Sequence, residues 1–498
     1  MGVIIRQSIA TTIISYVGLI IGYLNLLYLY PLFLSPDQVG LLRIIQDAAI
    51  LMAQFAQFGL AQSVIRYYPR FLGDTRKSQT LINLIVAAAV VAFGIFLVIY
   101  FVFETAILGY FQTNAEEFVQ YASLVLWLSF ITVMTTLMEV YSRSLLRNIL
   151  PNLLKEVIVR LLLAVAIIGY AQGLITFSEL AVATVLIYLI CLLILMAALA
   201  LQGHLSLSFD QSVIAPSLRK EMIRFSFLSF AGTAGLIIVG KVDSIMVAGL
   251  LGPAPVAIYS IAFYMATVIE IPKRAMTQVA SPLISRAFEK NDMAEIQKTY
   301  HKTALNQFIL GTLLLLGVIA NLNSIFHIMP KGDYYEAGRY VVVLVGIGKL
   351  VDMLFGPSSE IIVYSKYYAF SIMLILILAL ALVIGNNILI PLYGIQGAAL
   401  GSALAFILFN AVKFVFIWIK FQLQPFSWAF TKVLVITALA WFAQAWIPAA
   451  DNVLIDIMVR STIITSVFGL LTLGWHVSPD ANTLVNTLLA QAGIRKKP

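Results

Sequence analysis

Long apolar runs follow one another along almost the whole chain, and short connectors that carry proline, glycine or charge separate them. A helix that crosses a bilayer needs about 20 mostly apolar residues. Fourteen runs meet this need, at about residues 8–31, 41–65, 80–103, 119–142, 156–172, 178–201, 225–250, 256–276, 304–325, 337–362, 367–387, 396–419, 429–447 and 453–475. The pattern predicts an all-α integral membrane protein with about 14 transmembrane helices.

Composition supports the same class and changes how the net charge is interpreted. Hydrophobic residues make up 61% of the 498 residues and charged residues 11%, whereas an ordinary soluble domain has roughly 25% charged residues. The net charge of +8 would suggest a nucleic-acid partner in a soluble protein. Here most lysines and arginines fall in alternate connectors, and short cytoplasmic loops are enriched in both residues. We therefore expect no nucleic-acid partner, and both termini on the cytoplasmic side.

Two short segments indicate an internal repeat. LSPDQVGLL begins at Leu34 and LGPAPVAIY at Leu251, and their Leu, Pro and Val positions match. Six helices in each copy would give both copies the same orientation in the membrane, an arrangement typical of transporters. We predict an N-terminal six-helix lobe at 1–215, a C-terminal six-helix lobe at 216–422, and two additional helices with a basic tail at 423–498.

Two motifs carry a resemblance to a known family. DSIMVAGLLGPAPVAIYSIA, from Asp243, and ILIPLYGIQGAALGSALAF, from Ile388, resemble segments of the O-antigen (Wzx-type) polysaccharide flippases of the MOP exporter superfamily. The resemblance implies a V-shaped bundle of two lobes that alternates its opening across the bacterial inner membrane. It also implies transport of oligosaccharide on a polyprenyl pyrophosphate carrier to the outer leaflet, for lipopolysaccharide or other surface polysaccharide. Glycosyltransferases and a polysaccharide polymerase are the partners that such a role implies.

Other functions stay open at this point. The alternatives are a MATE-like drug or solute exporter, a flippase for the peptidoglycan precursor lipid II, and a membrane-embedded glycosyltransferase or acyltransferase. An enzyme is least favoured, because the four histidines lie far apart and no phosphate-binding GxxxxGK[ST] motif is present in the sequence. We therefore predict no catalytic residue, no metal site and no bound cofactor, and expect coupling to a proton gradient, a sodium gradient or the membrane potential.

Charged residues inside the apolar runs are the candidate site. A charge at the bilayer centre costs ~2.5 to 3.5 kcal/mol on insertion scales, so it normally faces protein or a wet cavity. Arg43 and Asp47 are four residues apart, and Lys349 and Asp352 are three apart. Each pair therefore shares one helix face. We predict that both pairs line a substrate cavity, although mutual neutralisation would also explain them.

Lys241 and Asp243 are different, because residues two apart point about 200° away from each other on a helix. Each therefore needs a partner from elsewhere in the chain. We predict that Lys241 faces a cleft and binds an anionic group, with Arg43 and Asp47 across that cleft. Asp243 would receive a sugar hydroxyl or a coupling cation. The alternative is an ion pair between helices that only stabilises packing.

Overall fold

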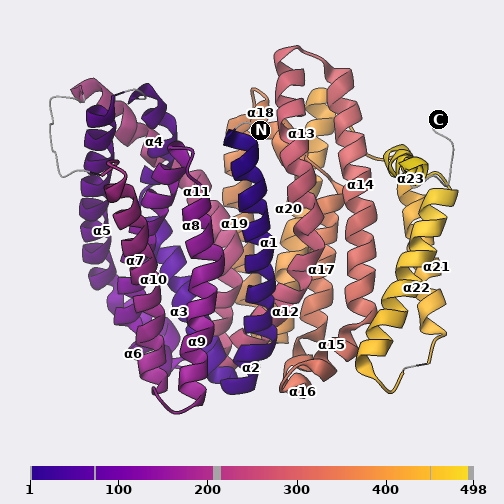
Figure 1. Ribbon diagram of the computed structural model, residues 1–498, viewed down its shortest axis with the longest axis horizontal. Coiled ribbons are helices and arrows are strands. Elements are labelled where there is room, and N and C mark those ends of the chain that lie inside the picture. Colours follow the sequence, from indigo (N-terminus) through magenta and orange to yellow (C-terminus); the bar gives the residue numbers. More distant parts are fainter. Residues whose placement is uncertain (1–2, 72–73, 206–214, 449, 492–498) are drawn as a thin grey trace. The chain divides into compact units, whose positions relative to one another are not determined.

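The computed structural model describes residues 3–71, 74–205, 215–448 and 450–491, and within these ranges it contains helices and no strand (Figure 1). The all-α prediction is confirmed. The chain divides into two compact units, each described here by itself. Unit 1 comprises Met1–Ser260 and Ile375–Ile395, and unit 2 comprises Ile261–Leu374 and Gln396–Pro498.

Unit 1 is built mainly from the first half of the chain. Its helices are α1 (Val3–Leu24), η1 (Asn25–Leu29), α2 (Tyr30–Phe33), α3 (Pro36–Ala56), α4 (Leu60–Tyr67), η2 (Tyr68–Phe71), α5 (Thr75–Gln112), α6 (Glu116–Gln120), α7 (Ala122–Ser144), α8 (Ile149–Leu153), η3 (Leu154–Ile158), α9 (Val159–Ala171), α10 (Phe177–Leu201) and α11 (Pro216–Leu251). The first part of α12 (Pro253–Thr267) and most of α19 (Tyr368–Tyr393) also belong to this unit.

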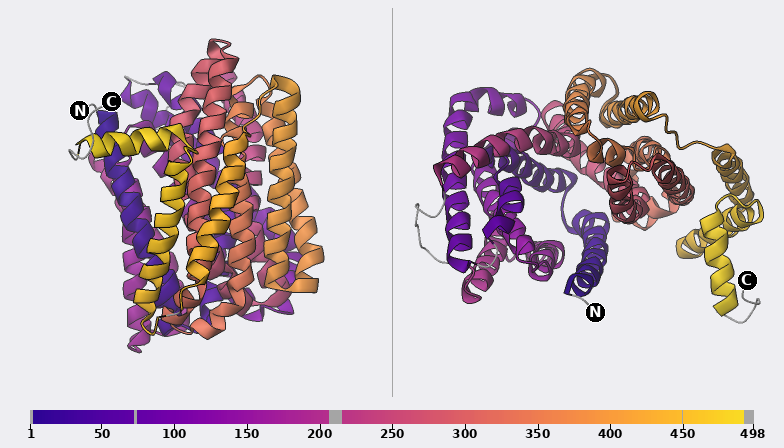
Figure 2. Two further views of the ribbon diagram at one scale, coloured as in Figure 1. Left: turned by 90° about the vertical axis from the view of Figure 1, so that its right-hand side faces the viewer. Right: turned by 90° about the horizontal axis from the view of Figure 1, so that it is seen from above.

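Unit 2 contains the remaining helices. They are η5 (Val268–Glu270), α13 (Ile271–Glu289), α14 (Met293–Ala320), α15 (Leu322–Ile328), α16 (Gly332–Tyr335), η6 (Glu336–Gly338), α17 (Arg339–Leu354), α18 (Ser358–Tyr364), α20 (Ile395–Phe421), α21 (Trp428–Ala445), α22 (Val453–Gly474) and α23 (Pro479–Gln491). In Figure 2, α23 lies across the direction of the long helices of this unit. The first turn of α23 contacts α14, because Lys302 Nζ of α14 lies 2.8 Å from Asp480 Oδ1.

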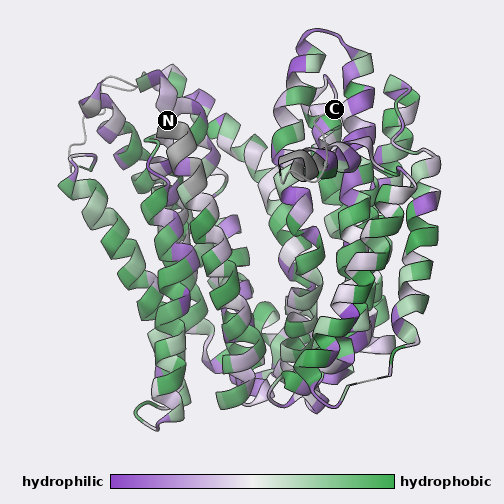
Figure 3. Cartoon of the chain, turned by 45° about the vertical axis from the view of Figure 1, so that its right-hand side comes forward, coloured by the Kyte–Doolittle hydropathy of each residue, from purple (hydrophilic) through white to green (hydrophobic). Residues whose placement is uncertain are grey.

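Twelve helices in the described part of the chain are long and apolar enough to cross a membrane. A thirteenth span results if α17 and α18, which bend by 50° at the break between them, count as one. Hydrophobic residues cover most of the helix lengths, and hydrophilic residues gather mainly in the loops and at helix ends (Figure 3). The chain is therefore a multi-pass membrane protein.

The predicted count of fourteen is not confirmed, and the difference lies at the run predicted for 156–172. The backbone there is helical from Ile149 to Ala171, but it changes from α8 to the π-helical turn η3 and then to α9. Lys155, Glu156 and Arg160 fall in and beside η3, and α9 has only 13 residues. Three charges within two turns shorten the apolar part of this helix.

The two copies of the repeat both open a helix with proline. Pro36 begins α3 and Pro253 begins α12, and proline suits the first helical position because it lacks an N–H and fixes φ. Ser35 caps α3, since its hydroxyl accepts from the Gln38 N–H and the Gln38 side chain accepts from the Ser35 N–H. Gly40 lies so near Pro253 that a Cβ would overlap the Pro253 carbonyl. The two repeat copies therefore meet at this glycine, inside unit 1.

The boundary between the two compact units does not coincide with the boundary between the two lobes predicted from the sequence repeat. The contact boundary falls inside α12, after Ser260, because α11 packs on α3 and α4. Ser63 and Ser226 hydroxyls lie 2.7 Å apart, and Gln54 donates to Thr233 at 2.8 Å. The predicted lobes at 1–215, 216–422 and 423–498 rest on the sequence repeat and stay a prediction. The basic end of the chain lies outside the described residues.

Candidate functional site

One buried carboxylate in unit 1 contacts two cations. Asp47 of α3 is 1% exposed. Arg43 Nε, one turn earlier on α3, donates to Asp47 Oδ2 at 3.0 Å, and Lys241 Nζ of α11 donates to Asp47 Oδ1 at 2.6 Å. The side chains of Arg43 and Lys241 are 18% and 20% exposed. The cluster therefore encloses its negative charge, leaves both cationic side chains partly exposed, and has a net charge of +1.

The prediction that Lys241 needs a partner from another helix is confirmed. That partner, Asp47, lies 194 positions away in the sequence but within the same compact unit. Lys241 contacts Asp47 directly, as in the alternative of an ion pair between helices, and the placement of these residues on a cleft stays a prediction. Helix α11 packs along α3. The Lys241 ammonium therefore lies against the buried Asp47 carboxylate and neutralises its charge.

Asp243 points to different helices. Tyr259 of α12 donates its hydroxyl to Asp243 Oδ2 at 2.6 Å, and Asn386 Nδ2 of α19 donates to Asp243 Oδ1 at 2.7 Å. Asp243 is 6% exposed. Lys241 and Asp243 are two residues apart on α11 and thus contact different helices, as the helix geometry predicts.

A second carboxylate with two cationic neighbours lies in unit 2. Lys273 Nζ of α13 donates to Asp352 Oδ2 of α17. Lys413 Nζ of α20 lies 3.8 Å from Asp352 Oδ1 and donates to Ser359 Oγ at 3.0 Å. The Lys413 side chain is 3% exposed, and its ammonium lies 4.4 Å from the centroid of the Phe409 ring. Lys413 is therefore a buried cation stabilised by a carboxylate, a hydroxyl and an aromatic face.

Lys349 does not pair with Asp352, although both lie on α17. Lys349 Nζ lies 2.5 Å from Glu270 Oε2 of η5, and the rings of Phe263 and Phe406 each lie 5.6 Å from it. Lys349 and Asp352 therefore contact separate partners from other elements. Mutual neutralisation on one helix face does not describe them.

Sequence reasoning missed several members of these clusters. Lys273, Lys413, Tyr259, Asn386 and Glu270 complete the polar contacts of the predicted site residues. Lys413 could have been found from the sequence, because it is a charged residue inside the apolar run FNAVKFVFIWIK, about two turns before the lysine that ends the run. Asn386 gives a weaker signal, since uncharged amides are tolerated in transmembrane helices. Within the described ranges, no group of three or more His, Cys, Asp and Glu residues is arranged to hold a metal ion.

Comparison with known proteins gives the family and the fold. The family described as "Polysaccharide biosynthesis protein" matches residues 4–288. The "probable low-salt glycan biosynthesis flippase Agl15" of Haloferax volcanii is 23% identical over an alignment of 244 residues, and the match covers 46% of this chain and 51% of that protein. The match thus spans about half the length of this curated relative.

Solved structures resemble the chain over most of its length. The structure described as "Lipid II flippase MurJ, inward closed conformation" has a TM-score of 0.75 at 13% identity. The match covers 94% of this chain and 99% of the chain in that structure. An inward-facing multidrug resistance MATE transporter of the MOP superfamily has a TM-score of 0.60 at 15% identity, covering 85% and 95%. Identities this low show the fold alone.

These three similar proteins are two flippases and a transporter, in agreement with the prediction that the chain is not an enzyme. The family match covers more than half of the chain, and the fold similarity extends over nearly all of it. The chain has the fold of MOP-superfamily transporters and belongs to the polysaccharide biosynthesis protein family.

Proposed function

We propose that the chain is a flippase that moves polyprenyl-pyrophosphate-linked oligosaccharide from the cytoplasmic to the outer leaflet by alternating access, for surface polysaccharide synthesis. The observation that carries the proposal is the cluster of Arg43, Asp47 and Lys241, which has a net positive charge and two partly exposed cations on membrane-length helices. The family description and the glycan flippase relative support a glycan as cargo.

A pyrophosphate suits this cluster chemically. An arginine presents a planar fork that matches two phosphate oxygens, and a lysine presents a compact, mobile point charge. Asp47 positions both cations while leaving one net positive charge to be neutralised by the ligand. Within unit 2, Lys349 and the pair of Asp352 and Lys273 are 15% to 21% exposed, and we include them in the proposed substrate path.

Asp243 is the proposed site of coupling to a cation gradient. Its carboxylate lies beside the Asn386 amide, whose Oδ1 is buried and has no hydrogen-bond partner among the described residues. Oxygen atoms of this kind suit a hard cation or a proton. Transport into vesicles with an imposed sodium or proton gradient tests the assignment. We expect Asp243→Asn to remove the dependence on the gradient, and an unchanged dependence would refute it.

The proposal places the chain in the bacterial inner membrane, with both termini in the cytoplasm and with glycosyltransferases and a polymerase as partners. The distribution of lysine and arginine supports this orientation. A cysteine in place of exposed Asp451 should react with a membrane-impermeant thiol reagent added outside, whereas cysteines at Lys77 and Lys290 should not. The reverse pattern would contradict the orientation.

Substitution of Lys241 tests the substrate role. Lys241→Ala leaves Asp47 paired with Arg43, so membrane abundance should stay near that of the unsubstituted protein. Export should fall about 10- to 100-fold, because a hydrogen bond to a charged group contributes about 1.5 to 3 kcal/mol. Lys241→Arg should retain part of the activity, because the charge survives.

The measurements are the amount of surface polysaccharide and the carrier-lipid pools of cells that carry each variant. A flippase defect should accumulate sugar-loaded polyprenyl pyrophosphate on the cytoplasmic side. Full export by a well-expressed Lys241→Ala variant would remove Lys241 from the substrate site. Unchanged lipid pools in cells without the gene would refute the flippase itself, and accumulation of lipid II or of an exported drug would assign one of the alternative functions.

A further inference from the structure

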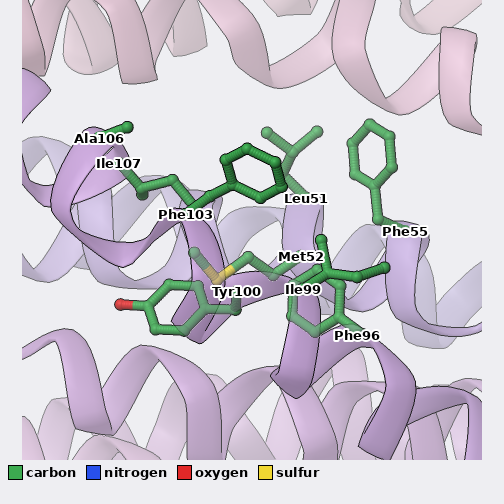
Figure 4. A pocket seen from close by; sticks show the side chains of 9 residues that line it. All are labelled: Leu51, Met52, Phe55, Phe96, Ile99, Tyr100, Phe103, Ala106 and Ile107. Atoms are coloured by element: carbon green, nitrogen blue, oxygen red, sulfur yellow. The ribbon is translucent and has the colours of Figure 1, made fainter.

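Unit 1 contains an apolar pocket between α3 and α5. Its volume is about 460 Å³, within the range of about 300 to 1,000 Å³ typical of pockets for small ligands. Figure 4 shows the lining side chains, which are Leu51, Met52, Phe55, Phe96, Ile99, Tyr100, Phe103, Ala106 and Ile107. No charged side chain is among them, and the Tyr100 hydroxyl and the Met52 sulfur are the side-chain heteroatoms. The lining suits a hydrocarbon and offers almost nothing to water.

The pocket opens beside a stripe of exposed apolar residues on α5. Tyr100 closes the inner side at 3% exposure, whereas Ile99 and Phe103 are 46% and 57% exposed. The neighbouring Val98 and Val102 are 65% and 72% exposed, as expected of side chains that meet lipid in a membrane-length helix. A hydrocarbon chain can therefore enter from the bilayer without crossing a polar barrier.

Helix α3 connects this pocket to the charged cluster. Leu51 lies one turn after Asp47, so the two side chains share a face of the helix. The distance along α3 from Arg43 to Met52 is about 13 Å, at 1.5 Å per residue. Phe55 also contacts α11, the helix that carries Lys241, with its ring centroid 5.8 Å from that of Phe230. A cationic cluster and an apolar pocket are thus adjacent on the same helices.

We propose that this pocket binds the part of the polyprenyl chain nearest the pyrophosphate while the pyrophosphate contacts Arg43 and Lys241. The inference rests on the proposed function, because that function supplies the anionic head and the isoprenoid chain. An amphiphile with an anionic head and a hydrocarbon chain fits this juxtaposition of a net positive cluster and an apolar pocket, and bulk phospholipid is the competing occupant that the experiment below distinguishes. The aromatic rings of Phe55, Phe96 and Phe103 suit the branched, unsaturated chain.

Photolabelling of the full-length protein tests the proposal. The protein is reconstituted in phosphatidylethanolamine and phosphatidylglycerol vesicles with a polyprenyl pyrophosphate that carries a diazirine near its head, and a parallel sample receives a diazirine-bearing phosphatidylcholine. After illumination, mass spectrometry locates the label. We expect the prenyl probe to label α5 between Phe96 and Ile107, and unlabelled polyprenyl pyrophosphate to compete with it.

Ala106→Trp should fill the pocket and reduce this labelling about tenfold, since displacing about two methylene groups of a bound chain loses roughly that much affinity. Val102→Trp is the matched control, because the same large side chain then lies on the lipid-facing stripe outside the pocket lining. Its labelling should equal that of the unsubstituted protein. The label position in the unsubstituted protein decides the question even if Ala106→Trp is unstable.

Several outcomes would overturn the proposal. Equal labelling by the phosphatidylcholine probe without competition would make the pocket a bulk-lipid site, and labelling confined to other helices would assign the chain elsewhere. Neither outcome touches the proposed function if Lys241→Ala still lowers export about 10- to 100-fold. Conversely, if the prenyl probe labels no part of the protein and export is unaffected by loss of the gene, the proposed function fails together with this inference.

Discussion

Asp47 in unit 1 and Asp352 in unit 2 each contact two cations, yet their surroundings differ. Asp47 receives one cation from its own helix and one from α11, and both cationic side chains are 18% to 20% exposed. Asp352 receives both lysines from other elements, and one of them, Lys413, is 3% exposed. The same ratio of charges therefore leaves both cationic side chains partly exposed in unit 1, whereas the unit 2 cluster combines a partly exposed lysine, Lys273 at 21%, with the enclosed Lys413. We therefore expect a carboxylate beside a buried cation to contribute more to stability than a carboxylate beside partly exposed cations.

The largest effect should follow Asp352→Asn. This change leaves buried Lys413 without its carboxylate, and removing one partner of a buried pair costs about 3 to 5 kcal/mol. Thermal unfolding of the purified protein and its abundance in membranes should both fall. Lys413→Met combined with Asp352→Asn should restore much of the loss, because the stranded charge disappears. If the single variant is as stable as the unsubstituted protein, Lys413 is not held by Asp352.

Asp47→Asn should have a smaller effect on stability. Arg43 and Lys241 can turn their partly exposed ends toward water, so the penalty should be nearer the ~1 to 3 kcal/mol of an unsatisfied polar group. Export should nevertheless decrease, because the two cations lose the group that positions them. The same unfolding and abundance measurements apply. A loss of stability equal to that of Asp352→Asn would remove the proposed difference between the two clusters.

Lys302→Ala should have the smallest effect and sets the baseline. Lys302 pairs with Asp480 at 2.8 Å, but their side chains are 46% and 45% exposed, and surface pairs contribute about 0 to 1 kcal/mol. Export and unfolding temperature should stay within error of the unsubstituted protein. A marked loss would show that the contact between α14 and α23 matters beyond its charges.

Contacts between side chains that are neighbours on one helix could be predicted from the sequence. The Arg43 and Asp47 pair follows from a spacing of four residues, and the structure contains it. The contact between Lys241 and Asp47 spans 194 positions, so spacing could show that Lys241 needs a partner but could not identify it. Lys349 shows the limit of the spacing rule, because Glu270 from another element reaches it at 2.5 Å.

The fold was easier to predict than the site. Apolar runs of membrane length have few structural alternatives, since every backbone polar group in lipid needs a partner within the helix. The region around η3 was the exception, because Lys155, Glu156 and Arg160 interrupt the apolar run while the backbone stays helical. The site required tertiary information, since Asp243 contacts Tyr259 and Asn386 from two other helices.

The double pairing of Asp47 also has a consequence for biogenesis. Arg43 and Asp47 can pair as soon as α3 forms, so α3 can enter the bilayer with the charge of Asp47 already paired. Lys241 is synthesised 194 residues after Asp47, roughly 10 to 40 seconds later at about 5 to 20 residues per second. The arginine thus serves as an early counter-ion during that interval, and the lysine of α11 finds a carboxylate already positioned when its own helix inserts.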